Sequence, residues 1–155
     1  MDAIFKYIET SICERYAELY QQPYFVSIGY FKDFDFASIG KKKFEVKFDC
    51  KSITTGNFAV EVSYKGHPSG LTDTKADYII FSYPDGLKIN CFEVETNTLR
   101  MVVEKYRIIT GGDGNNSAMK LIPVEVIKSI SSDKFTVDLE LPEAYWLENC
   151  KLKNT

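Results

Sequence analysis

The sequence has few of the residues on which several common kinds of functional site depend. His67 is its only histidine, and its four cysteines form no CxxC pair. These absences argue against a histidine-rich zinc site, a zinc knuckle and a thioredoxin-type motif, and we expect reduced thiols. No apolar run approaches the roughly 18 to 20 residues of a membrane-spanning helix, and the first residues lack the basic start and apolar core of a signal peptide. We therefore expect an intracellular protein with no membrane partner.

Positive charge is not in excess either. Nineteen Lys and Arg residues stand against 22 Asp and Glu residues, which gives a net charge of -3. A general basic coat for nucleic acid is therefore absent, and binding of phosphate would need a local patch or a metal ion that reverses the sign of an acidic site. The only local basic run is Lys41, Lys42 and Lys43. It is the best candidate for a nucleic-acid contact, although a solvated turn explains it equally well.

The pattern of apolar residues predicts one mixed α/β domain that covers residues 1–155. Apolar residues at three- and four-residue steps predict a helix over residues 5–19, and a second helix is predicted to begin at Thr96 or Asn97. A short helix is expected at 142–149, whereas the assignment of 124–130 stays open. Runs of aromatic and β-branched residues predict strands at 24–31, 44–49, 57–64, 78–83 and 87–94, and residues 121–124 are expected to form a short strand or a turn.

The strand predicted at 44–49 alternates strictly between apolar and charged residues. Glu45, Lys47 and Asp49 share one face, and Asp35 precedes Glu45 by ten positions. Two carboxylates brought together on adjacent strands form a hard-oxygen site suited to Mg²⁺, and a lysine on the same face can orient water or balance negative charge. Asp33 competes with Asp35 for this role. An edge strand with a solvated, charge-paired face would show the same pattern.

The motif Asp35, nine residues, then Glu45-Val46-Lys47, after a helix that carries three glutamates, resembles the PD-(D/E)XK nuclease superfamily. The segments TGNFAVE at 55–61 and PSGLTDTKADY at 68–78 are similar to small phage-encoded members of that group. The resemblance implies an α+β mixed sheet with an αβββαβ core and Mg²⁺-dependent cleavage of DNA, less often of RNA. The chain departs from the family pattern because neither candidate aspartate follows a proline.

The resemblance also implies roles for individual residues. Asp35 and Glu45 would be metal ligands, Lys47 would orient water or stabilise charge, and Glu61 would be a supporting acid that joins from the neighbouring strand. On the predicted helix, about 100° per residue places Glu9 and Glu18 at the margins of the apolar stripe and Glu14 nearly opposite to it. Glu9 and Glu18 are therefore the better helix acids. Ser69 and Thr74 lie in a loop that could bind phosphate or simply connect two strands.

These observations predict a Mg²⁺-dependent endonuclease that hydrolyses DNA, with RNA as a second substrate class and Mn²⁺ as a substitute ion. The protein would be phage-encoded, act in the host cytoplasm and could pair as a homodimer. The alternative is a catalytically inactive module of the same fold that binds nucleic acid or a protein partner. In a third reading, the charged row is only the solvated face of a structural domain.

Overall fold

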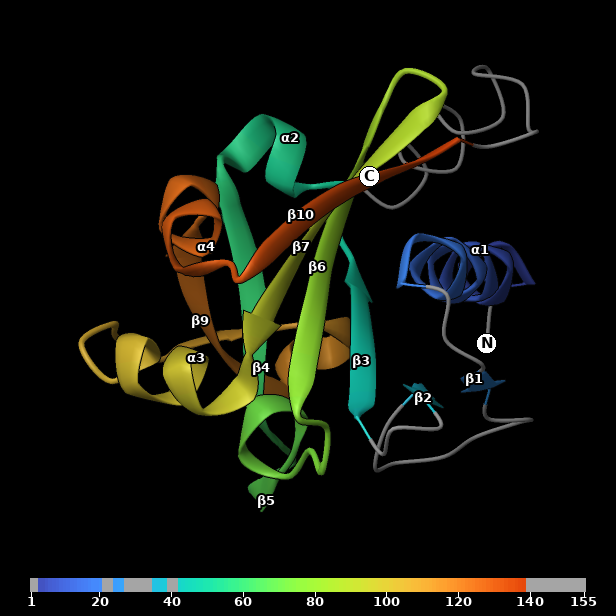
Figure 1. Cartoon of the computed structure of the whole chain (residues 1–155). Helices are drawn as coiled ribbons and strands as arrows, with labels where there is room; N and C mark the ends of the chain where they lie inside the picture. The colour runs from blue at the N-terminus through green and yellow to red at the C-terminus, as the bar shows by residue number, and fades with distance from the viewer. Residues whose placement is uncertain (1–2, 21–23, 27–34, 39–41, 139–155) are drawn as a thin grey trace.

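Two β-sheets organise the part of the chain that the computed structural model describes, which comprises residues 3–20, 24–26, 35–38 and 42–138 (Figure 1). The strand order is β1-β2-β3-β6-β7-β10 in the six-stranded sheet and β5-β4-β9-β8 in the four-stranded sheet. The strands of the larger sheet are β1 Tyr24–Val26, β2 Phe36–Ser38, β3 Lys43–Phe48, β6 Tyr78–Asp85, β7 Lys88–Glu95 and β10 Asp133–Asp138. Those of the smaller sheet are β4 Asn57–Tyr64, β5 His67–Pro68, β8 Ile109–Gly111 and β9 Ser117–Pro123.

Four α-helices and two short 3₁₀ turns complete the described elements, so the predicted mixed α/β class is confirmed. The helices are α1 Ala3–Tyr20, α2 Ser52–Thr55, α3 Thr96–Val103 and α4 Val124–Ile130, and the turns are η1 Gly70–Thr72 and η2 Asp113–Asn115. None of the helices in the described segments is both long and apolar enough to cross a bilayer.

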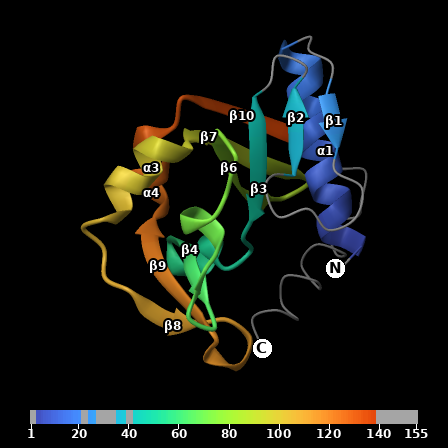
Figure 2. The same cartoon turned by 90° about the horizontal axis from the view of Figure 1, so that it is seen from below.

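Two apolar clusters lie on opposite faces of the six-stranded sheet. Helix α1 covers one face, where Ile8, Ile12 and Tyr16 pack against Phe44 and Val46 of β3. The smaller sheet, α3 and α4 lie on the other side (Figures 1 and 2). The second cluster joins Phe58, Val60 and Ile122 of the smaller sheet with Ile79 and Phe81 of β6. Because side chains alternate along a strand, the charged residues of β3 face this second layer.

Strand β3 lies inside the sheet and not at its edge. It pairs antiparallel with β2 through Phe36 and Phe44, and parallel with β6 through residues 44–48 and 78–82. The reading of β3 as an edge strand with one solvated face is therefore wrong. The apolar alternation was read correctly, but periodicity within one strand does not reveal how many neighbours the strand has.

Most of the predicted elements are present with small shifts of their ends. The helix over 5–19 is α1, the second helix is α3, and the open segment 124–130 is helix α4. Strands β2, β5, β8 and β10 and helix α2 were not predicted, and β9 begins four residues before the short strand or turn expected at 121. The predicted strand end at 27–31, the competing acid Asp33 and the helix at 142–149 lie outside the described residues.

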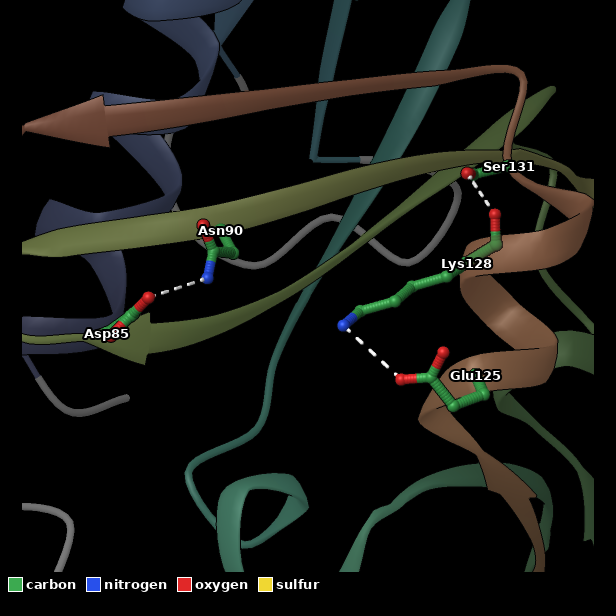
Figure 3. Close-up of polar contacts among 5 residues, drawn as sticks. All are labelled: Asp85, Asn90, Glu125, Lys128 and Ser131. Atoms are coloured by element: carbon green, nitrogen blue, oxygen red, sulfur yellow. Dashed lines mark hydrogen bonds and ion pairs between the residues drawn. The ribbon is translucent and has the colours of Figure 1, made fainter.

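The hairpin between β6 and β7 was predicted around Pro84, Asp85 and Gly86, and this prediction is confirmed. Asn90 Nδ2 donates a hydrogen bond of 3.3 Å to Asp85 Oδ2 across the hairpin (Figure 3). On α4, Lys128 Nζ lies 3.4 Å from Glu125 Oε1, and the ammonium lies 5.6 Å from the centre of the Phe92 ring. Of these contacts, the one between Lys128 and the Phe92 ring joins α4 to β7.

The cysteines differ in state. Cys13 and Cys91 are free and buried in the α1 side of the core. Cys50 is disulfide-bonded, so the expectation that every thiol is reduced is wrong for this residue. The wide spacing of the cysteines gave no sign of the bond, because disulfide partners are neighbours in space and need not be neighbours in sequence.

Candidate functional site

Asp35 and Glu45 lie close together where β2 meets β3. Phe36 pairs with Phe44, and Asp35 N, one residue before β2 begins, donates a hydrogen bond of 2.8 Å to Phe44 O. The charge of Asp35 raises the pKa of Glu45. Asp35 Oδ2 also accepts a hydrogen bond of 2.6 Å from Val46 N. This bond fixes one carboxylate oxygen of Asp35 and leaves Oδ1 without a hydrogen bond to the described residues.

Burial sets the ionisation of both acids. The pKa of Asp35 is raised to about 6, chiefly by burial and then by the charge of Glu9, whereas the hydrogen bond from Val46 N and the charge of Lys6 oppose the rise. The pKa of Glu45 is also raised, chiefly by burial and then by the charges of Asp35 and Glu61, whereas a side-chain hydrogen bond with Thr74 and the charge of Lys47 lower it. Carboxylates that are costly to ionise together make a site at which a cation is favoured.

Thr74 holds Glu45 in place. Its side chain is buried, and its Oγ1 accepts a hydrogen bond of 3.1 Å from Ala76 N while the hydroxyl is bonded to Glu45. Thr74 N also donates 2.9 Å to Gly70 O, which ties it to the η1 turn. In this structure the Thr74 hydroxyl is bonded to a carboxylate, and its binding of substrate phosphate stays a prediction.

Glu61 reaches the site from the second sheet. It was expected on a strand next to β3, but β4 belongs to the four-stranded sheet, so this part of the expectation is wrong. Two hydroxyls hold its carboxylate: Ser117 Oγ donates 2.6 Å to Oε1, and Ser69 Oγ donates 3.0 Å to Oε2. The pairing of β4 with β9 shifts by one residue between Glu61 and Ser63. Such bulges re-aim side chains, and this one lies directly after Glu61.

The structure distinguishes the helix acids. Glu9 lies 3.7 Å from Lys6 through Oε2, and this oxygen is buried without a hydrogen bond to the described residues. Burial raises the pKa of Glu9, the charge of Lys6 opposes this, and the charge of Glu45 adds to the rise. Glu18 instead pairs with Arg15 at 3.1 Å with its side chain 72% exposed. Glu9 is therefore the helix acid that joins the group, and Glu18 is not brought to it.

Lys47 and Asp49 differ in their contacts, although the sequence predicted that both lie on one face of a strand. Lys47 is half-buried, and its ammonium makes no hydrogen bond or ion pair within the described part of the chain, while its charge lowers the pKa of Glu45. Asp49 follows the end of β3, and its carboxylate accepts hydrogen bonds from Lys51 N at 2.9 Å and Ala59 N at 3.4 Å. Asp49 thus fixes the connection to β4, and Lys47 keeps an ammonium available beside Glu45.

The predicted basic run lies at the start of β3. Lys42 and Lys43 are exposed, and the Lys42 ammonium lies 5.1 Å from the centre of the Tyr78 ring. Lys43 N donates 2.9 Å to Asp77 Oδ2. Lys41 lies outside the described residues. A role of this run in binding substrate stays a prediction.

Asp35 and Glu45 suit Mg²⁺ as a pair of carboxylates and not as part of a complete cage of protein ligands. Within the described ranges, no group of three or more His, Cys, Asp and Glu side chains is arranged to hold an ion. Mg²⁺ needs no such cage, because it keeps several waters and is bound in proteins by one or two carboxylates together with substrate phosphates. Asp35 and Glu45 supply two carboxylates of this kind, and the carboxylate of Glu9, whose buried Oε2 lies 3.7 Å from Lys6 Nζ, adds negative charge nearby.

Two positions in this region were missed by sequence reasoning. Ser117, which is 6% exposed, bonds Glu61 from β9. Gly70 has φ of +55°, and a Cβ atom at this position would lie 2.3 Å from Glu61 O. Nothing in the sequence marks Ser117, because it lies 56 residues from Glu61. Gly70 stood within the quoted PSGLTDTKADY segment, but only the fold shows that it packs against Glu61.

No protein-family model, no curated protein and no solved structure matches this chain.

Proposed function

We propose that the chain is a Mg²⁺-dependent phosphodiesterase, an endonuclease of the PD-(D/E)XK type that hydrolyses DNA. The observation that carries the proposal is the convergence of Glu9, Asp35 and Glu45. Each of the three pairs interacts electrostatically so that one charge raises the pKa of another. Buried like charges cost free energy, and a bound divalent cation would recover that cost. A purely structural face would have no need for such a group.

The residues divide the work by their chemistry. Asp35 and Glu45 would hold the ion, and Mg²⁺ in that position supplies positive charge beside the scissile phosphate. The Lys47 ammonium can donate a hydrogen bond to the attacking water or stabilise charge that develops on the phosphate oxygens. Glu61 is fixed by Ser69 and Ser117 and acts through its charge on Glu45. Mn²⁺ would substitute for Mg²⁺, because both ions prefer oxygen ligands.

The order of the first elements supports the finer fold assignment. Helix α1 is followed by β1, β2 and β3, which agrees with the αβββ part of the αβββαβ core. The parallel pairing of β3 with β6 requires a crossover, and this crossover contains the four-residue helix α2 together with β4 and β5. A phage origin, RNA as a second substrate and pairing as a homodimer belong to the same proposal.

The test is cleavage of supercoiled plasmid, single-stranded DNA and RNA by the purified full chain with Mg²⁺ or Mn²⁺. Asp35→Asn, Glu45→Gln and Lys47→Met should each lower the cleavage rate by about 100-fold or more, because each removes a charge from the site. Glu14→Gln and Lys134→Met are matched controls, since both residues are exposed and lie outside the site. Their rates should stay within about twofold of the wild type.

Two results would overturn the proposal. In the first, the wild-type chain cuts none of the three substrates with either ion. In the second, it cuts DNA but Glu45→Gln cuts equally fast. Metal-independent binding of DNA without any cleavage would favour the alternative, a catalytically inactive module of the same fold.

A further inference from the structure

A cavity of about 540 Å³ adjoins the candidate site at the end of the sheet where β3 and β6 begin. The cavity is open to solvent and is lined by the start of β3, the segment that follows η1 and the first residues of α3, which meet at the lower end of the view in Figure 1. Thr74 belongs both to the cavity lining and to the site, because its hydroxyl is bonded to Glu45. A ligand in this cavity would therefore lie next to the acids.

Arg100 lines the cavity and carries a charge that no carboxylate balances within the described ranges. Its Nε donates 3.2 Å to Leu71 O, and its Nη2 donates to Leu71 O at 3.2 Å and to Thr74 O at 3.1 Å. Nη1 donates 3.2 Å to Asn97 Oδ1, which leaves one Nη1 hydrogen without an acceptor among the described residues. All of these acceptors are neutral. A half-buried guanidinium bonded only to neutral oxygens favours an anion nearby.

The other charged side chains that line the cavity also favour an anion. Lys42 and Lys75 line the cavity with Arg100, against the carboxylates of Asp77 and Glu95, so the lining carries one net positive charge. One oxygen of Asp77 is already bonded by Lys43 N at 2.9 Å. The chain as a whole has a net charge of -3. A locally positive cavity attracts anions even when the protein as a whole is acidic.

We propose that this cavity binds a backbone phosphate of the nucleic-acid strand, adjacent to the phosphate that is cut. This inference rests on the proposed function, because the neighbouring carboxylates define which phosphate is cleaved. The volume exceeds that of a phosphate group and leaves room for the attached sugar and for water. Arg100 and the two lysines would position the strand without reading its bases, since contacts to phosphate carry no direct sequence information.

Binding of a short fluorescein-labelled DNA strand and of the matching duplex to the Glu45→Gln protein tests the inference by fluorescence anisotropy. Adding Lys75→Ala or Lys42→Ala to this background should raise Kd by about 3- to 10-fold and lower the slope of log K against log salt by about one unit each. Lys134→Ala is the matched control, because Lys134 is exposed on β10, at the opposite edge of the six-stranded sheet from β1 and β2. It should change Kd by less than about 1.5-fold.

Arg100→Lys keeps the charge but loses the planar fork, and we expect weaker binding than in the Glu45→Gln parent. Its thermal unfolding is compared with that of the parent, since Arg100 also holds the η1 segment through Leu71 and Thr74. Should that variant fail to fold, the exposed Lys75 still decides the question.

The outcomes separate this inference from the nuclease proposal. Unchanged Kd and salt slope in both lysine variants would overturn the phosphate subsite, even if the wild-type chain cuts DNA with Mg²⁺. Weakened binding in these variants supports the subsite, even if the wild-type chain cuts nothing. Equal weakening by Lys134→Ala would show only a general effect of charge and would also overturn it.

Discussion

Val46 donates its backbone N–H to Asp35 Oδ2 at 2.6 Å, in the middle of the strand that carries Glu45 and Lys47. The bond attaches Asp35 to β3 one residue before the paired part of β2, which begins at Phe36. It orients the carboxylate and also stabilises its charged form. Burial and the charge of Glu9 outweigh this effect, because the pKa of Asp35 is still raised to about 6.

The raised pKa of Asp35 predicts how stability depends on pH when no divalent ion is present. Its pKa rises from 3.8 to about 6 on folding, so its favourable contribution is complete below about pH 4 and is lost as the pH rises through 6. Asp35→Asn cannot ionise. It should therefore increase the free energy of unfolding by about 1 to 3 kcal/mol at pH 8 and change it little at pH 4.

Urea unfolding across this pH range, with a chelator present, measures the effect. Asp73→Asn is the control, because Asp73 is exposed and follows η1 at the surface. A lower free energy of unfolding for Asp35→Asn at pH 8 would contradict the prediction. It would mean that the charged carboxylate stabilises the fold without a cation.

A bound divalent cation should offset the loss of folding stability that the ionised, buried carboxylates cause. Mg²⁺ or Mn²⁺ at about 100 times its Kd stabilises a folded protein by about 2.7 kcal/mol if it does not bind the unfolded chain. We expect a rise in Tm that is larger at pH 8 than at pH 5, because the carboxylates must be ionised to bind the ion. The rise should disappear in the double variant Asp35→Asn, Glu45→Gln. An equal rise in that variant would place the ion elsewhere.

Sequence periodicity predicted which residues of β3 share a face, but it did not predict which residues of other elements lie near them. Alternation within 44–49 identified the shared face of Glu45 and Lys47, because side-chain direction in a strand follows from position alone. The same rule placed Asp49 on that face. Asp49 lies just beyond the end of β3, and there its carboxylate bonds Lys51 N and Ala59 N. Alternation ceases to hold where the strand ends.

Contacts between segments that are far apart in the sequence could not be predicted from strand periodicity. Glu61 and Ser117 meet because β4 pairs with β9, and no local pattern predicts a pairing between strands that are separated in the chain by four other strands and helix α3. The three-residue strand β2 was hidden in a stretch that looked polar, since three residues are too few to show a period. Helix geometry narrowed the acids of α1 to Glu9 and Glu18, and only tertiary contacts separated the two.

Glu9 and Glu18 offer a matched pair of substitutions on α1. Glu9→Gln removes a charge that interacts with Glu45 and Asp35, so cleavage should slow by about 10-fold or more and the optimal Mg²⁺ concentration should change. Glu18→Gln removes only an exposed ion pair with Arg15, worth less than about 1 kcal/mol. Its cleavage rate should equal that of the wild type. Equal losses in the two variants would indicate that α1 acts only through its packing.

Gly70 tests how closely the η1 turn must approach Glu61. An added Cβ would lie 2.3 Å from Glu61 O at a residue with φ of +55°, so Gly70→Ala combines backbone strain with a steric clash. Gly66→Ala is the matched control, because Gly66 has φ of +78° and nothing lies within 4 Å of its added Cβ. We expect Gly70→Ala to lower the free energy of unfolding by about 3 kcal/mol and Gly66→Ala by about 1 kcal/mol.

Chemical denaturation of the two glycine variants beside the wild type gives the comparison. The difference between them isolates the clash with Glu61, because both substitutions place alanine at a positive φ. Gly70→Ala should also slow cleavage, since Ser69 and Thr74, which hold Glu61 and Glu45, flank the displaced turn. Equal destabilisation by the two substitutions would show that the turn can move away from Glu61 at no cost, and the close packing of η1 on β4 would then have no part in fixing these acids.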